Sequence, residues 1–87
     1  MADNARFDDC NHAVLAFLAA RQTLKFSVDA IRAKVNRDGG DYSWTEIRDA
    51  LEFLEGKRLV EMSYDDLGAM PYFQATSDGV LHWRRNL

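Results

Sequence analysis

Cys10, His12 and His82 are the side chains of this sequence best suited to nucleophilic or metal chemistry. Cys10 and His12 lie two residues apart, and at that spacing on a helix the side chains point in different directions, so His12 is not expected to activate the thiol. A single cysteine also excludes an internal disulfide and a cysteine-rich metal site. The glycine pair at 39–40 is interpreted as a turn and not as a phosphate-binding loop. The sequence therefore predicts a protein that is not an enzyme and that holds no metal or other cofactor.

The arginine and lysine side chains carry the remaining recognisable chemistry, because they bind phosphate groups. The 87-residue chain has 11 of them against 14 aspartates and glutamates, for a formal net charge of −3 and a pI of about 5.2. Proteins that depend on phosphate contacts usually carry a basic face. Any such face in this chain must be local, so the elements that position the bases decide where it lies.

Two helices are predicted in the first half of the chain. Residues 1–9 are interpreted as a flexible tail, and the two aspartates at its end as the start signal of a helix over residues 10–21. Ser27 is a good N-cap for a second helix, which ends near Asn36 because a glycine-rich turn follows at 37–41. Apolar residues recur at helical spacing in both segments, so each is expected to bury one face in a common core.

The third helix has the clearest start signal in the chain. Ser43 is expected to cap the backbone amide of Glu46, and the Glu46 side chain to reach back to the amide of Ser43, which together form a capping box. Gly56 marks the end of the helix. The predicted buried stripe of this helix is Ile47, Ala50, Leu51 and Leu54.

A β-hairpin over residues 59–75 is predicted to follow the third helix. Residues 60–64 alternate between apolar and polar side chains, and Pro71 is tolerated at the start of a strand. Residues 76–79 are interpreted as a turn or as the start of a last short helix. The predicted fold class is therefore α+β and mainly α, with three helices, a two-stranded hairpin and a short C-terminal helix in one domain over residues 10–87.

Three segments of the chain carry a resemblance to known proteins. Residues 26–31 (Phe-Ser-Val-Asp-Ala-Ile) look like the start of a second helix, residues 47–60 like a recognition helix that runs into a first wing strand, and residues 72–79 like a second wing strand with the turn after it. In this order they resemble the winged helix-turn-helix superfamily, and in particular its small regulators of bacterial or phage type. The resemblance covers about residues 12–84. Arg58 departs from it, since members often have glycine before the strand.

The resemblance implies a transcriptional regulator whose third helix, over residues 43–55, enters the major groove of double-stranded DNA. The hairpin over residues 59–75 would be the wing. Arg48 would contact a guanine edge or a phosphate, because its guanidinium presents paired donors. The candidate DNA-binding residues are Ser43, Trp44, Thr45, Arg48, Lys25, Arg32 and Lys57.

The charges on these surfaces favour an alternative, a winged-helix module that binds another protein, as an adaptor or assembly subunit, and not DNA. Residues 44–55 contain four acids against one base, and the wing tip carries Asp65 and Asp66 without a base. DNA phosphates repel such surfaces. Phe53 and Trp44 would then be the anchors for a protein partner. Phe53 also fits a packing position under the hairpin or the C-terminal segment.

The hydropathy of the chain bears on its location. No apolar stretch approaches the roughly 20 residues that span a bilayer, and residues 1–6 lack the apolar core of a signal peptide. We therefore expect a cytoplasmic protein without membrane contact. We also expect a homodimer, because one short recognition helix gives limited specificity and paired half-sites give more. The first helix and the C-terminal helix are the expected dimer surfaces.

Overall fold

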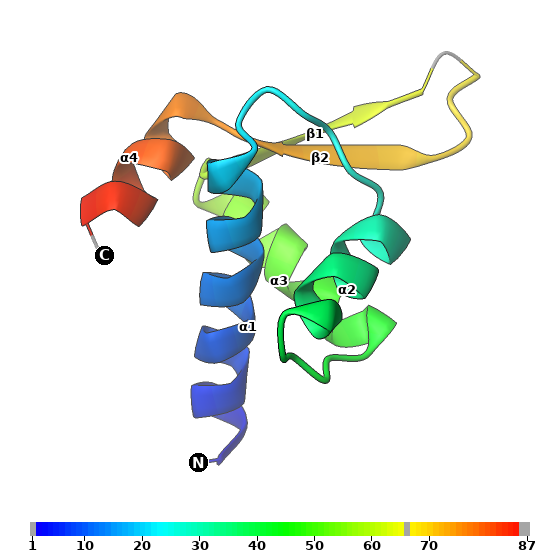
Figure 1. Ribbon diagram of the computed structural model, residues 1–87. Helices are drawn as coiled ribbons and strands as arrows, with labels where there is room; N and C mark the ends of the chain where they lie inside the picture. The colour runs from blue at the N-terminus through cyan, green and yellow to red at the C-terminus, as the bar shows by residue number, and fades with distance from the viewer. Residues whose placement is uncertain (1, 66, 86–87) are drawn as a thin grey trace.

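The structure, a computed structural model, describes residues 2–65 and 67–85, with side chains from residue 5 onward. Within these ranges the chain forms helices and one hairpin in the order shown in Figure 1. The elements are α1 (Ala2–Ala20), α2 (Val28–Arg37), α3 (Trp44–Gly56), β1 (Val60–Tyr64), β2 (Pro71–Ala75) and α4 (Ser77–Arg85). This is the predicted α+β architecture of three helices, a hairpin and a short C-terminal helix. None of the described helices combines the length and the apolar character needed to cross a membrane.

Helix α1 starts earlier than predicted. Residues 2–9 are helical and not a flexible tail, so Asp8 and Asp9 lie inside the helix and do not cap it. The segment contains neither glycine nor proline, and its Arg6 and Phe7 side chains both contact α3. Helices in proteins gain most of their stability from such packing. Because a local start signal does not include these contacts, the helix start predicted from the sequence is too late in the chain.

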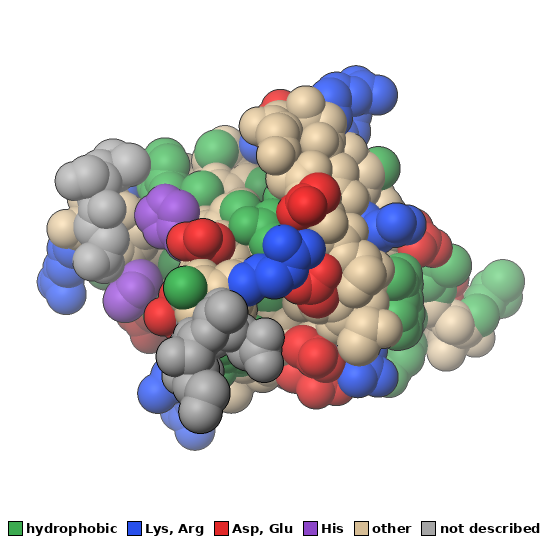
Figure 2. All heavy atoms as spheres, turned by 90° about the horizontal axis from the view of Figure 1, so that it is seen from below, with side chains coloured by type: hydrophobic (Ala, Val, Ile, Leu, Met, Phe, Trp, Pro, Cys, Tyr) green, Lys and Arg blue, Asp and Glu red, His purple; other side chains and the backbone are tan. Residues whose placement is uncertain are grey.

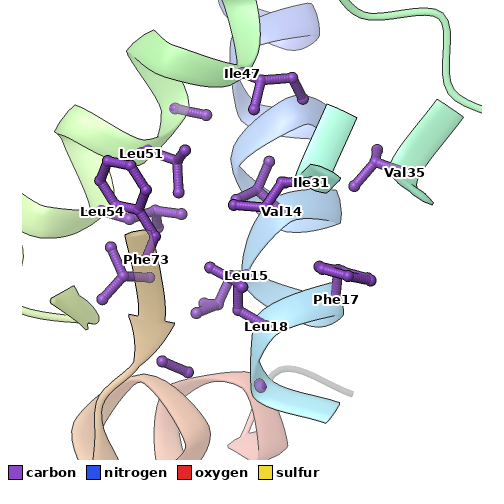
Figure 3. Close-up of a cluster of buried hydrophobic side chains, with 14 of the residues drawn as sticks. Val14, Leu15, Phe17, Leu18, Ile31, Val35, Ile47, Leu51, Leu54 and Phe73 are labelled. Carbon is purple, nitrogen blue, oxygen red and sulfur yellow. The ribbon is translucent and has the colours of Figure 1, made fainter. Parts of the chain in front are cut away.

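The core lies where α1, α2 and α3 meet, and strand β2 closes one side of it (Figure 3). The apolar stripes predicted for α2 and α3 are buried there. The side chains without any solvent exposure include Val14, Leu18, Ile31, Ile47 and Leu51. Because all three helices supply such side chains, the core fixes the orientation of α3 and leaves its opposite face in solvent.

The turn between α2 and α3 is held by the side chain of Asn36. Its Nδ2 donates to the carbonyl of Tyr42 at 2.9 Å, and its Oδ1 accepts from the amide of Tyr42, also at 2.9 Å. Ser43 follows directly and caps α3 as predicted, since its hydroxyl accepts from the amide of Glu46 at 3.2 Å and Glu46 Oε1 accepts from the amide of Ser43 at 3.0 Å. The hydrogen bonds of this turn and cap therefore fix the position at which α3 starts.

The hairpin pairs β1 with β2 in antiparallel register, with Met62 opposite Phe73. Phe26 adds a bridge to the other edge of β2, where the two backbones exchange hydrogen bonds of 2.9 and 2.8 Å with Phe73. At the tip, the carboxylate of Asp65 accepts from the amide of Ala69 at 2.9 Å. Asp65 therefore has a structural role in the loop, whereas Asp66, the second predicted tip acid, lies outside the described residues.

Helix α4 is fixed at its start by Thr76. The Thr76 hydroxyl accepts from the amide of Gly79 at 2.9 Å and donates to the carbonyl of Arg58 at 2.8 Å. Gly79 is buried against the backbone of Leu59, so closely that an added Cβ would lie 1.9 Å from the Leu59 carbonyl oxygen. The first turn of α4 therefore contacts the segment that joins α3 to β1.

Arg58 stands where the proteins that the sequence resembles often have glycine, and it has a φ of 62°. This left-handed conformation costs a non-glycine residue about 1–2 kcal/mol, whereas glycine adds about 0.5–1 kcal/mol of backbone entropy to the cost of folding. We therefore expect Arg58→Gly to raise the free energy of unfolding by roughly 0.5–1 kcal/mol. Urea denaturation measures the difference.

Lys57→Gly is the matched control for this prediction. Lys57 has a φ of −87°, so glycine relieves no strain there and should lower the free energy of unfolding by about 0.5–1 kcal/mol. Equal losses in the two variants would contradict the prediction, because they would mean that the backbone at Arg58 is not strained.

Candidate nucleic-acid interface

The N-terminal half of α3 presents its outer face to solvent. Ile47 is fully buried and anchors this half in the core, while Trp44 is 43% exposed and Thr45 and Arg48 are exposed beside it. The first backbone N–H groups of a helix have no carbonyl partner in the preceding turn. The exposed end of α3 therefore combines free amide donors, the positive end of the helix dipole and an arginine, which suits a phosphate group.

Arg48 makes only exposed contacts. Its guanidinium lies 3.0 Å from the carboxylate of Asp49, with each side chain about half exposed, and 5.7 Å from the centre of the Trp44 ring. Such surface ion pairs contribute about 0–1 kcal/mol. The guanidinium can therefore exchange Asp49 for a phosphate or a base edge at small cost, while the indole ring restricts where it points.

The acids of α3 fall into two groups. Glu46 accepts from Ser43 in the capping box and also binds the guanidinium of Arg6. The hydrogen bond from Arg6, followed by that from the Ser43 amide, lowers the pKa of Glu46 to about 2. The hydrogen bond to Glu46 also raises the pKa of Arg6. Glu52 and Glu55 are exposed, and neither joins an ion pair within the described ranges 2–65 and 67–85. The repulsive charge on α3 is therefore concentrated in its second half.

The lowered pKa of Glu46 makes a prediction about acid stability. Because the folded state favours the Glu46 carboxylate, this group contributes to the free energy of unfolding. The contribution is fully present above about pH 4.5 and is lost as the pH falls from about 4.5 to about 2. We expect the wild-type protein to be more stable than Glu46→Gln at pH 7, and the two free energies of unfolding to converge near pH 2. Urea denaturation at successive pH values measures the convergence.

Glutamine is the suitable replacement here, because it also completes a capping box and so removes the charge of Glu46 while retaining the cap. The effect will be small, since the pair with Arg6 lies at the surface. A difference between the two proteins that stays constant from pH 7 to pH 2 would show that the Arg6 pair contributes nothing.

The other predicted bases are distributed unevenly around α3. Arg32 is exposed on α2, and its Nε donates to the carbonyl of Tyr42 at 3.1 Å, so it lies next to the start of α3. Lys25 precedes the bridge residue Phe26. Lys57 follows the opposite end of α3, roughly 20 Å along the helix axis from its start. The structure therefore brings Ser43, Trp44, Thr45, Arg48 and Arg32 to one end of α3 and places Lys57 at the other.

Arg6 is the base that sequence reasoning missed. It reaches across from α1 to Glu46 and lies 3.3 Å from the carboxylate of Asp41. It was assigned to a tail and so was not considered as a neighbour of α3. Its effect is to neutralise acids close to the start of α3. Figure 2 shows the result on the face seen from below, where acidic and basic side chains are interspersed.

Phe53 packs against α1. Its ring meets that of Phe7 edge-on, with centroids 5.3 Å apart, and the Nζ of Lys57 lies 5.6 Å from its centre. It is still 41% exposed. Phe53 therefore has a packing role, as its other interpretation predicted. The neighbour in the ring contact is Phe7 of α1, whereas the prediction named the hairpin or the C-terminal segment. This contact does not favour the use of Phe53 as an anchor for a protein partner.

Cys10 and His12 are separated as predicted. The Cys10 side chain is buried, its thiol donates to the carbonyl of Glu46 at 3.6 Å, and burial raises its pKa to about 11. The nucleophilic form of cysteine is the thiolate, so this thiol is unreactive at neutral pH. His12 lies on the surface. Among residues 2–65 and 67–85, no group of three or more His, Cys, Asp or Glu side chains could hold a metal ion.

Comparison with known proteins supports the fold. No protein-family model matches the chain, and no curated protein matches it. Solved structures do. A double mutant of ZitR from Lactococcus lactis is 18% identical, with a TM-score of 0.71, over 90% of this chain and 49% of that one. The MepR–DNA complex of S. aureus is 19% identical, with a TM-score of 0.75, over 98% of this chain and 68% of that one.

A third similar structure is a PadR family transcription regulator from hypervirulent Clostridium difficile R20291, which is 15% identical with a TM-score of 0.76 over 88% of this chain and 81% of that one. The chain spans about half the length of the ZitR chain. At these identities the likeness concerns the fold, and it confirms the predicted winged-helix architecture of three helices followed by a two-stranded hairpin.

Proposed function

We propose that this winged-helix domain binds double-stranded DNA as part of a transcription regulator, with α3 in the major groove and the hairpin along the backbone. The observation that carries the proposal is the exposed and capped N-terminal half of α3, where Thr45 and Arg48 project from a helix end that the core holds rigidly. The similarity to MepR, whose structure was solved with DNA, supports it.

Each residue at this end of α3 has a distinct role in the proposal. Arg48 reads a guanine edge or holds a phosphate through its paired donors. The hydroxyl of Ser43 accepts from Glu46 and keeps its own proton to donate, and Thr45 and the backbone amide of Trp44 donate to the same phosphate at the helix N-terminus. These contacts set the register of α3 on the duplex.

A second set of contacts is electrostatic. Arg32 and Lys25 are exposed, and we assign them to the backbone on either side of the groove. The described part of the wing tip contributes no base, and Leu67 there is 90% exposed. We assign Lys57 no part in this contact set, because it lies at the far end of α3. The protein therefore neutralises few phosphates, so its nonspecific affinity is low.

The experiment is a salt titration of binding to a random-sequence duplex, followed by fluorescence anisotropy. With Arg48, Arg32 and Lys25 as the phosphate-binding bases, log K should fall with log salt with a slope of about −3 for each chain. Absence of binding at roughly 20 mM salt would refute the proposal. Binding that does not change with salt would refute it too, since phosphate contacts release counterions.

We also propose that the protein binds DNA as a homodimer, because a single short helix reads few base pairs and two half-sites about one helical turn apart read more. The stoichiometry follows from an anisotropy titration, above the dissociation constant, of a duplex selected from the random-sequence pool for tight binding and so carrying one specific site. Two chains for each specific site are expected, and a single chain at saturation would exclude the dimer.

A further inference from the structure

A cavity of about 530 Å³ lies between α1, α3 and α4, at the opposite end of α3 from the proposed DNA contacts. Leu15, Leu54, Leu59 and Trp83 supply apolar walls, and Phe53 lies at its edge. Small-molecule sites in proteins are typically clefts of roughly 300–1,000 Å³ with mainly apolar walls and a few fixed polar groups. This cavity has the size and the lining of such a site.

One polar group of the cavity lacks a partner. Asn11 lines it from α1 and is only 7% exposed, and its side-chain oxygen Oδ1 is buried without a hydrogen bond among the residues that the structure describes. More than about 90% of buried polar groups in proteins have a partner, and a buried acceptor without a donor destabilises the fold. A donor in the cavity reaches this oxygen only when the Asn11 amide turns toward it, because the oxygen has almost no accessible surface as the side chain stands.

The polar side chains around the cavity include one acid, one lysine and two histidines. Asp8 and His12 come from α1, Lys57 follows α3, and His82 comes from α4. The two histidines lie far apart in the sequence, yet both line this cavity. Figure 2 shows the histidine side chains together on one face. One acid opposite one lysine gives no excess charge that would select a strong anion or cation.

We propose that this cavity binds a small neutral aromatic molecule that donates one N–H or O–H hydrogen bond to Asn11 Oδ1. The apolar walls select the ring, the volume limits its size, and the unpartnered oxygen selects a donor. The site lies at the other end of α3 from Ser43 and Arg48, so this inference does not depend on the proposed DNA binding.

The test compares two ring systems of the same shape. Indole carries an N–H donor, and 1-benzofuran has an oxygen atom in its place. In NMR titrations of the whole chain, indole should shift the backbone amides of Asn11, Leu54 and Leu59, and it should bind at least about fivefold more tightly than benzofuran, the value of one hydrogen bond. Equal affinities, or tighter binding of benzofuran, would overturn the proposal. So would shifts confined to other residues.

Asn11→Leu removes the acceptor and keeps a similar volume. The variant should lose the preference for indole and bind the two compounds within about twofold of each other, and the proton spectrum establishes that it is folded. A preference for indole that survives in this variant would overturn the assignment to Asn11. If the variant does not fold, the comparison of the two compounds in the unmodified protein still decides. Absence of shifts with either compound would mean that solvent satisfies Asn11, and would also overturn the proposal.

Discussion

Replacing Gly79 by alanine should destabilise the domain by about 3 kcal/mol or detach α4 from it. The position is buried, and a Cβ there would lie 1.9 Å from the carbonyl oxygen and 2.9 Å from the carbonyl carbon of Leu59. The neighbours are backbone atoms, so no side-chain rotation relieves the overlap. Overpacking of this kind costs about 1–3 kcal/mol and at times more. For a domain of this size the melting temperature should fall by roughly 12–24 °C.

Gly56 provides the matched control. It ends α3 in ordinary helical backbone, and no atom lies within 4 Å of an added Cβ. Gly56→Ala should therefore leave the stability unchanged or raise it by up to about 1 kcal/mol, because alanine favours helix and restricts the unfolded chain. If Gly79→Ala melted at the same temperature as Gly56→Ala, the first turn of α4 would not be in contact with Leu59.

The parts of the fold that the sequence predicted are those encoded locally. The capping box of Ser43 and Glu46, the cap at Ser27 and the strand over residues 60–64 are each predicted from residues within a few positions of one another. The structure contains all three, although the burial of the strand's side chains does not alternate. The start of α1 depends instead on Arg6, which binds Glu46 forty positions later. A pattern search along the chain does not detect a contact of that range.

The exposure of the candidate residues at the start of α3 was predictable from the sequence, but the charge beside them was not. Counting acids treated Glu46, Asp49, Glu52 and Glu55 as equal, whereas the structure pairs Glu46 with Arg6 and Asp49 with Arg48. Arg48 was already the one base in that count, so Arg6 is the base that the structure adds beside these acids. The cavity near Asn11 was not predictable at all, because its walls come from three helices whose packing no local pattern records.

The proposal for α3 makes Arg48 the most sensitive position for DNA binding. Arg48→Ala should weaken the affinity for a random duplex at least tenfold at low salt, since a bidentate contact contributes about 1–3 kcal/mol. The slope of log K against log salt should also fall in magnitude by about 1. Because the side chain is exposed and its ion pair with Asp49 is a surface pair, the thermal stability should change little. Anisotropy titrations and a melting curve measure the two effects separately.

Arg37→Ala is the control that distinguishes the loss of a direct Arg48 contact from the general effect of removing one positive charge. Arg37 is exposed at the end of α2 and loses the same charge, so long-range attraction falls equally in both variants. We expect Arg37→Ala to lose less than about threefold in duplex affinity and Arg48→Ala to lose at least tenfold. This difference would place Arg48 at the DNA, since a general charge effect is screened beyond about 10 Å at 0.1 M salt. Equal losses would leave only nonspecific attraction and would remove α3 from the proposed interface.

Glu52→Gln tests the same surface with the opposite sign. Glu52 is exposed one turn after Arg48 and has no ion-pair partner among the described residues, so it faces the same phosphates if α3 occupies the groove. Removing its charge should strengthen duplex binding by a few-fold at low salt, and the gain should disappear as salt screens the repulsion. A loss of affinity in Arg48→Ala together with a gain in Glu52→Gln requires both side chains to lie near DNA. A variant that binds no better than the wild-type protein would mean that the second half of α3 turns away from the duplex, with contact restricted to its capped end.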